Sequence, residues 1–204
     1  MIFQRILMAM ALGGLLTTPT HAQETEAHKQ QLDQDNTLVM VEEGMYTHSW
    51  FLNSFLELRE DLNESAAEGK ALVVIWTQKG CVYCERLMKT TISTPKVNAF
   101  MREHFNVVQL NKYGSRDVTD FGGETLAENK MARKFRVAYT PTIQFFVADA
   151  SENEDGAVDV EALNVPGYLP PEQFYNLLEF VKERRFREQS LISFLKDVEG
   201  TLEN

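Results

Sequence analysis

Cysteine is scarce in this sequence, with only two among 204 residues. Two cysteines exclude a disulfide-rich scaffold and a four-cysteine zinc site. Basic residues are also few, 20 against 30 acidic ones, which gives a formal net charge of -10. A chain this acidic is a poor polyanion binder, so we expect no nucleic-acid partner. The one long uncharged apolar run lies near the N-terminus. We therefore expect no internal transmembrane helix, and a protein that is not an integral membrane protein.

The N-terminal residues have the pattern of a secretory signal peptide over 1–22. Arg5 gives a positive start, and Ile6 to Leu16 form an apolar run too short to span a bilayer comfortably. Thr20-His21-Ala22 then supplies small residues for a signal peptidase. We expect cleavage after Ala22 and an oxidising compartment, the periplasm in a Gram-negative source. The alternative is an uncleaved interfacial anchor.

The rest of the chain is predicted to hold a flexible N-terminal segment at 23–48 and one domain at 49–199. The domain opens on a predicted helical extension, because Phe51, Phe55, Leu58 and Leu62 recur at spacings of three and four. Gly69 is its expected stop. We also expect the aromatic residues Trp50, Phe51 and Phe55 in the core.

Continuous apolar runs and capped periodic segments alternate along this domain. The runs predict strands at 71–76, 106–110, 143–147 and 158–165. Helices are expected at 81–89, 95–104, 125–135, 171–181 and 191–198, with an acidic hairpin turn at 151–156. Helices between the early strands favour parallel crossovers, and the short turn favours an antiparallel last pair. This order predicts an α/β fold in which helices flank one mixed sheet, closed by a C-terminal helix.

Cys81 and Cys84 stand directly between a predicted buried strand and a predicted helix. A helix N-terminus carries unpaired N–H groups and about half a positive charge. Such placement lowers a cysteine pKa from about 8.5 into a range of roughly 3.5 to 7.5. Lys79 adds a positive charge nearby. Cys81 is therefore the expected nucleophile, and Cys84, one turn inward, is within reach of a mixed disulfide formed at Cys81.

Other interpretations of the cysteine pair stay open at this stage. The alternatives are a purely structural disulfide and a two-coordinate copper(I) site. The four histidines show no ligand spacing to the cysteines, and Met88 offers no convincing third ligand. We therefore assign no metal ligand.

Thr140-Pro141 precedes the predicted strand at 143–147. The simple interpretation is a proline that opens a strand. The sharper one is a cis peptide bond beside Cys81. In that case the Thr140 backbone is free to pair with an extended substrate.

In this order and spacing, strand, CxxC, helix and a late Thr-Pro resemble the thioredoxin superfamily over about 71–181. Gly80-Cys-Val-Tyr-Cys84, Gly114-Ser-Arg-Asp-Val-Thr-Asp120 and Tyr139-Thr-Pro-Thr142 resemble most closely the SoxW-type exported thioredoxins of bacterial sulfur-oxidation gene clusters. The resemblance implies a thioredoxin fold, Cys81 as nucleophile, Cys84 as resolving thiol and Pro141 as cis-proline.

The sequence departs from thioredoxin itself around the cysteines. Gly80 replaces a tryptophan, and Val82-Tyr83 replaces Gly-Pro, as in the aromatic variants of glutaredoxins and periplasmic isomerases. Ile75 takes the position of a buried aspartate, and Gln109 that of its lysine neighbour. Loss of both members leaves no unpaired buried charge. The usual carboxylate-assisted deprotonation of Cys84 is then in doubt.

The segment from Asn111 to Glu128 exceeds the usual thioredoxin connection. It is predicted to be a surface loop leading into a capped helix. Alternatively, it forms a partner-recognition edge in which Tyr113, Arg116 and Phe121 are exposed.

These patterns together predict an exported thiol–disulfide oxidoreductase that reduces a cysteine-containing periplasmic protein and receives electrons from a membrane thiol relay. No cofactor is expected beyond the redox-active Cys81–Cys84 disulfide. The expected substrate contacts are Val82, Tyr83, Thr140 and Pro141. Alternatives are a periplasmic disulfide oxidase or isomerase and, in another class, a copper(I) carrier or non-catalytic binding module.

Overall fold

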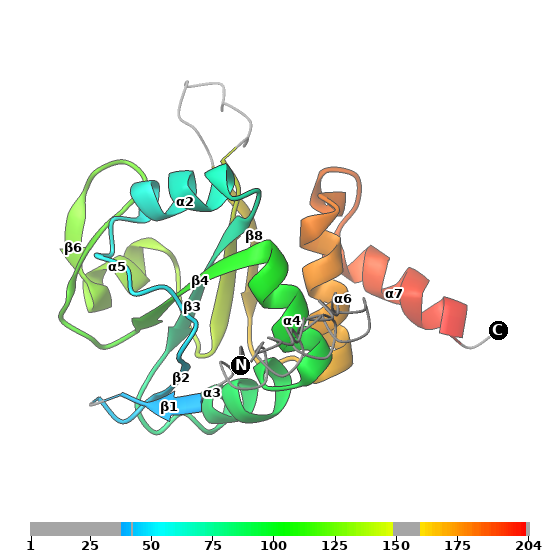
Figure 1. Ribbon diagram of the computed structural model, residues 1–204, viewed down its shortest axis with the longest axis horizontal. Helices are drawn as coiled ribbons and strands as arrows, with labels where there is room; N and C mark the ends of the chain where they lie inside the picture. The colour runs from blue at the N-terminus through cyan, green and yellow to red at the C-terminus, as the bar shows by residue number, and fades with distance from the viewer. Residues whose placement is uncertain (1–37, 42, 149–159, 203–204) are drawn as a thin grey trace, which may run out of the picture.

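A four-stranded sheet forms the centre of the protein (Figure 1). The computed structural model describes residues 38–41, 43–148 and 160–202. The strand order is β4-β3-β7-β8. β3 runs parallel to β4 and antiparallel to β7, which runs antiparallel to β8. The predicted mixed sheet is confirmed, and its strands are β3 (Ala71–Thr77), β4 (Phe105–Asn111), β7 (Thr142–Phe146) and β8 (Glu161–Pro166).

Helices cover both faces of this sheet (Figure 1). α2 (Leu58–Ala67) and α5 (Glu128–Lys134) pack on one face, and α4 (Pro95–His104) and α6 (Pro171–Lys182) on the other. Side chains alternate along β3, so Ile75 joins the α4 and α6 core whereas Trp76 joins the α2 and α5 core. Because both faces are covered, β3 is apolar along almost its whole length.

The helix that follows β3 changes geometry along its length. α3 (Val82–Arg86) continues directly into the π-helical turn η1 (Leu87–Ile92). At the other end of the chain, η2 (Arg185–Arg187) leads into α7 (Leu191–Leu202). Phe194 of α7 packs against Phe180 of α6 with ring centroids 5.0 Å apart. The expected C-terminal helix is thereby confirmed.

The predicted N-terminal helix begins later than its periodicity indicates. Residues 50–57 form turns and coil, and α2 starts at Leu58. Leu56 adopts a left-handed backbone with φ 64°. Its N–H donates to the Ser54 hydroxyl at 2.7 Å, and that hydroxyl donates to Asp61 at 2.6 Å. Side-chain hydrogen bonds of this kind compete with helix formation, so the helical spacing upstream of Leu58 misleads.

Because α2 starts late, the aromatic residues expected in the core differ in their burial. Phe51 is buried as predicted, and Trp50 is partly buried beside it, with ring centroids 4.7 Å apart. Phe55 is 97% exposed, so its predicted place in the core is wrong. The coil turns Phe55 outward, whereas a helix would have kept it on the same face as Phe51.

A hairpin occupies the stretch where a flexible segment was expected. β1 (Leu38–Met40) pairs antiparallel with β2 (Tyr46–His48) through a turn in which Gly44 has φ 75°. His48 Nε2–H donates to the Met88 carbonyl at 3.1 Å and ties the hairpin to η1. The prediction of flexibility is therefore wrong for 38–41 and 43–48. Residues 1–37, with the predicted signal peptide, lie outside the described residues.

The segment after β4 is organised around a buried carboxylate. It contains a hairpin of β5 (Asp117–Thr119) and β6 (Thr125–Ala127), so the helix expected from Thr125 starts only at Glu128. The Glu128 side chain is fully buried. It accepts hydrogen bonds from the Asn111 N–H at 2.8 Å and from the Arg116 guanidinium at 2.6 Å. This carboxylate closes the segment into a fixed structure.

Two further predictions concern the segment that leads into β8 and the expected lack of a membrane-spanning helix. The acidic turn predicted at 151–156 lies outside the described residues, and the strand predicted from Val158 is seen from Glu161. Within the described part of the chain, no helix is long and apolar enough to cross a membrane.

Glu128→Gln should destabilise the protein by about 2 kcal/mol, because an amide replaces the buried carboxylate that accepts from the Asn111 N–H and the Arg116 guanidinium. The measurement is the free energy of unfolding in urea. Glu103→Gln is the matched control, since the Glu103 side chain is 73% exposed and should change stability by less than about 0.5 kcal/mol. Equal effects of the two variants would contradict the role of Glu128.

Candidate functional site

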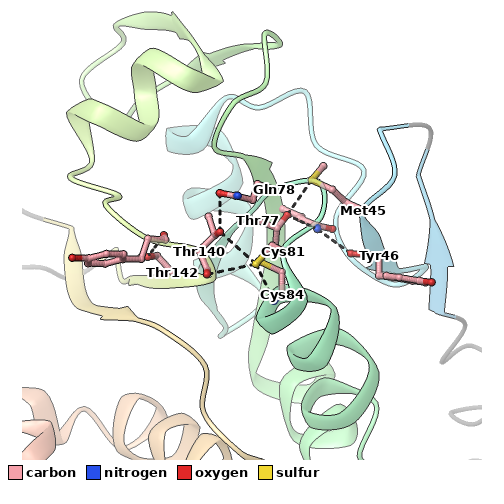
Figure 2. The surroundings of a disulfide bond; sticks show 10 residues. Met45, Tyr46, Thr77, Gln78, Cys81, Cys84, Thr140 and Thr142 are labelled. Carbon is pink, nitrogen blue, oxygen red and sulfur yellow. Dashed lines mark hydrogen bonds between the residues drawn. A yellow bond between two sulfur atoms is a disulfide. The ribbon is translucent and has the colours of Figure 1, made fainter.

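The two cysteines form a disulfide where β3 passes into α3 (Figure 2). The sulfur atoms are 2.06 Å apart and the Cα atoms 5.2 Å apart. Cys81 is the N-cap of α3, and its Sγ accepts a hydrogen bond from the Cys84 N–H at 3.1 Å. Gly80, with φ 72°, supplies the left-handed turn that leads the chain into the helix. The predicted strand–helix junction is confirmed.

The two sulfur atoms differ in accessibility. Cys81 is partly exposed, whereas Cys84 is only 4% exposed. Between them, Val82 and Tyr83 are 74% and 58% exposed. An incoming group therefore reaches Cys81, flanked by two exposed apolar side chains, and Cys84 can react only from inside the protein.

Thr140 meets Cys81 from the loop before β7 (Figure 2). The Thr140–Pro141 peptide bond is cis, as the sharper interpretation predicted. The Thr140 carbonyl oxygen lies 3.5 Å from Cys81 Sγ, and the Thr140 hydroxyl lies 3.4 Å from the same sulfur. That hydroxyl also donates to Gln78 Oε1 at 3.0 Å. A hydroxyl has one proton, so Gln78 and the sulfur compete for it.

A neutral hydrogen-bond chain lies under the disulfide. Gln109 Nε2 donates to the Thr77 hydroxyl at 2.8 Å and to the Tyr46 carbonyl at 3.0 Å. The Thr77 hydroxyl donates in turn to Met45 Sδ at 3.4 Å. Thr77 is 1% exposed and lines the same cavity as Cys84. The buried polar atoms are thus satisfied without any charge.

Ile75 and Gln109, two uncharged residues, lie side by side on β3 and β4. Ile75 is fully buried and stands in register with Gln109 on the neighbouring strand. The Gln109 amide reaches Thr77, two residues further along β3. An amide and a hydroxyl therefore meet close to the buried Ile75, and neither group carries a charge.

Lys79 is placed beside the hairpin. A Cβ built on Gly44 would lie 3.4 Å from Lys79 Cε, so the lysine stem runs along the β1–β2 turn. Its expected electrostatic effect on Cys81 remains a prediction.

The predicted recognition edge at Asn111 to Glu128 is only partly exposed. Tyr113 is 67% exposed, as expected. The Arg116 guanidinium binds the buried Glu128, and Phe121 packs against Phe146 with ring centroids 4.5 Å apart. Of the three residues expected to be exposed, Tyr113 and Arg116 are exposed and Phe121 is half-buried, and the Arg116 guanidinium also holds the segment together through Glu128.

Several residues of the site were missed from sequence. Thr77 and Gln78 lie within four residues of Cys81, so the chain position itself was an available signal. Met45 and Tyr46 reach the site through the hairpin, and Met40 lines the same cavity. No local pattern marks a long-range contact of this kind. Among the described residues, no group of three or more His, Cys, Asp or Glu side chains is arranged to hold a metal ion.

Fold and site together define a thioredoxin-like domain with a dithiol–disulfide centre. A family model described as Thioredoxin-like domain matches residues 58–182, and the chain belongs to this family. No curated protein matches the chain.

Solved structures with a similar fold come from several bacteria. A thioredoxin-fold protein from Helicobacter pylori is 22% identical, with a TM-score of 0.49 over 63% of this chain and 83% of that one. A thioredoxin from Thermus thermophilus is 24% identical, with a TM-score of 0.46 over 61% and 83%. The C-terminal domain of DsbD from Neisseria meningitidis, in its reduced form, is 14% identical, with a TM-score of 0.39 over 60% and 88%.

Gln78→Ala should make Cys81 ionise at lower pH in the reduced protein. Removal of Oε1 releases the Thr140 hydroxyl to donate to the thiolate. A hydrogen bond to a charged group contributes roughly 1.5–3 kcal/mol, and one pH unit corresponds to about 1.4 kcal/mol, so we expect a shift of about one to two pH units. The measurement is the ultraviolet absorbance of the thiolate against pH in a Cys84→Ser background.

Thr140→Val is the control for this competition. It removes the shared proton, so Cys81 should ionise at higher pH, and Gln78→Ala should then have no further effect. If the Gln78→Ala shift persists in the Thr140→Val background, the Thr140 hydroxyl does not cause it.

Proposed function

We propose that the protein is a thiol–disulfide oxidoreductase that reduces a disulfide on a partner protein. The observation that carries this proposal is the disulfide at the N-terminus of α3, with a partly exposed Cys81 and a buried Cys84. A purely structural disulfide has no need for this asymmetry. Exchange chemistry needs one sulfur that meets the partner and a second that only resolves the intermediate.

The reaction runs in two exchanges from the reduced protein. The Cys81 thiolate attacks one sulfur of the partner disulfide, forms a mixed disulfide and releases the other partner sulfur as a thiolate. Cys84 then loses its proton and attacks Cys81 Sγ. This step restores the Cys81–Cys84 disulfide and releases the second partner thiolate. Two electrons pass to the partner, and a donor dithiol must return two to the protein.

Electrostatics at the helix start favour the first exchange. The Cys84 N–H that donates to Cys81 Sγ at 3.1 Å is one of the unpaired groups at a helix N-terminus. It stabilises negative charge on that sulfur, both in the attacking thiolate and when the same thiolate leaves. Thr140 offers a carbonyl beside the sulfur, where an extended partner backbone can pair.

The second exchange takes place beside the uncharged side chains of Thr77 and Gln109. Thr77 and Gln109 supply a hydroxyl and an amide near Cys84, and the one carboxylate that lines the same cavity, that of Glu85, is paired with Lys89 at 2.6 Å. We infer that the Cys84 proton leaves through water in the cavity that Thr77 and Cys84 share. This cavity, of about 180 Å³, has room for several water molecules.

The location and the electron donor are also part of the proposal. The signal-peptide pattern at 1–22 supports export to the periplasm, and the resemblance to SoxW-type proteins supports a membrane thiol relay as donor. We propose as substrate a periplasmic protein with a cysteine at its reacting site, which agrees with both the export and the membrane relay. The rival oxidase or isomerase rests on the Val82-Tyr83 dipeptide between the cysteines.

Cysteine variants test the two roles. Cys81→Ser should abolish reduction of insulin or of a model disulfide, because no exposed thiolate remains. Cys84→Ser should instead accumulate a mixed disulfide with its partner, visible by mass spectrometry and reversed by dithiothreitol. Cys81→Ser is the matched control for this trap, since it keeps one cysteine in the same helix. Full activity of Cys81→Ser would end the proposal.

The redox potential separates the two directions. We expect a value near the roughly −270 mV of thioredoxin rather than the roughly −120 mV of a strong periplasmic oxidant. Equilibration of the pair with glutathione or thioredoxin of known potential gives the value. A potential near roughly −120 mV would instead assign the protein as a disulfide oxidase.

A further inference from the structure

Four sulfur-bearing side chains surround one cavity beside the active disulfide. The cavity has a volume of about 180 Å³ and lies between the β1–β2 hairpin and the start of α3. Met40 and Met45 line it from the hairpin, and Cys81 and Cys84 line it from the helix. Figure 2 shows Met45 on the hairpin side of the disulfide. The chain has eight methionines and two cysteines in all, so this gathering of sulfur is a marked local enrichment.

The Met45 thioether is held in place by the protein. The Met45 side chain is 6% exposed, and its Sδ accepts a hydrogen bond from the Thr77 hydroxyl at 3.4 Å. Gln109 fixes that hydroxyl from the other side at 2.8 Å. These two hydrogen bonds hold the Met45 sulfur against Thr77, which lines the same cavity. Met40, 60% exposed, stands at the open rim of the cavity.

The donor set of this cavity is soft. Thiolate and thioether ligands select copper(I), whereas magnesium and calcium require oxygen ligands. The one carboxylate among the lining residues is that of Glu85, and it already pairs with Lys89 at 2.6 Å. In the described part of the chain, no cluster of three His, Cys, Asp or Glu side chains competes for a harder ion.

We propose that the reduced protein binds one copper(I) ion through the Cys81 and Cys84 sulfur atoms and Met45 Sδ. The two thiols lose two protons when the Cu–S bonds form, and no electron is transferred. Both thiolates are occupied in this form, so it cannot take part in disulfide exchange. The site requires only the reduced cysteine pair, which a phosphine reductant supplies in vitro, and it is independent of the direction in which the pair works.

Anaerobic titration of the reduced full chain with copper(I), against the chromophoric chelator bicinchoninate, tests the site. We expect one ion per chain and loss of binding in both Cys81→Ser and Cys84→Ser. Met45→Leu should weaken binding at least about tenfold, because even the loss of an outer-shell partner costs roughly 10–100-fold in metal affinity. Leucine matches methionine in volume, so the cavity keeps its shape.

Met101→Leu is the matched control. Met101 is fully buried in the core on the α4 and α6 side and does not line this cavity, so its copper(I) affinity should equal that of the unaltered protein. Equal affinities of Met45→Leu and Met101→Leu would overturn the proposal. Failure of the unaltered protein to compete with the chelator would do the same.

X-ray absorption at the copper edge counts the ligands without any variant. Three sulfur neighbours support the site, and two sulfur neighbours overturn the role of Met45. Reduction of insulin by the metal-free protein is measured separately. A protein that reduces insulin but holds no copper(I) therefore refutes this inference and leaves the proposed function standing.

Discussion

One hydrogen bond connects the fold to the chemistry of this protein, that from the Cys84 N–H to Cys81 Sγ at 3.1 Å. It exists because a helix begins at Val82, so the first N–H groups of that helix have no carbonyl partners of their own. The sulfur of Cys81 takes the place of such a partner and gains from any negative charge it carries. β3 ends at Thr77, and the left-handed turn at Gly80 follows. The covered sheet thereby fixes the position of this helix start.

The polar side chains that make hydrogen bonds beneath and beside the disulfide are neutral. Thr77 and Gln109 satisfy one another under the cysteines, and Gln78 and Thr140 share one proton beside Cys81. Neutral partners avoid the desolvation of a buried carboxylate and amine. The single proton of the Thr140 hydroxyl has two acceptors within reach, Gln78 Oε1 and Cys81 Sγ.

The hairpin β1–β2 covers a side of the disulfide that the central sheet does not cover. His48 ties the hairpin to η1 through the Met88 carbonyl, and Gly44 lets its turn approach Lys79. The hairpin forms one side of the cavity at the disulfide and contributes two methionine side chains to its lining. On the far side of β4, Glu128 performs a comparable structural role by holding 111–128 closed. Each addition is tied to the rest of the domain by hydrogen bonds, the hairpin through His48 and the 111–128 segment through Glu128.

Sequence alone determined the mixed sheet, the helix start at the cysteines, the cis bond before Pro141 and the neutral pair Ile75 and Gln109. The sheet and the helix start follow from local rules, apolar runs and helix capping, whereas the cis bond and the neutral pair were expected from the resemblance to thioredoxins, because most X-Pro bonds are trans. Only the tertiary structure decided that α2 starts at Leu58, that Phe55 faces solvent and that Arg116 binds Glu128. It alone brought Met45 to the disulfide. These outcomes depend on contacts between residues far apart in the chain, and helical spacing or local charge carries no information about such contacts.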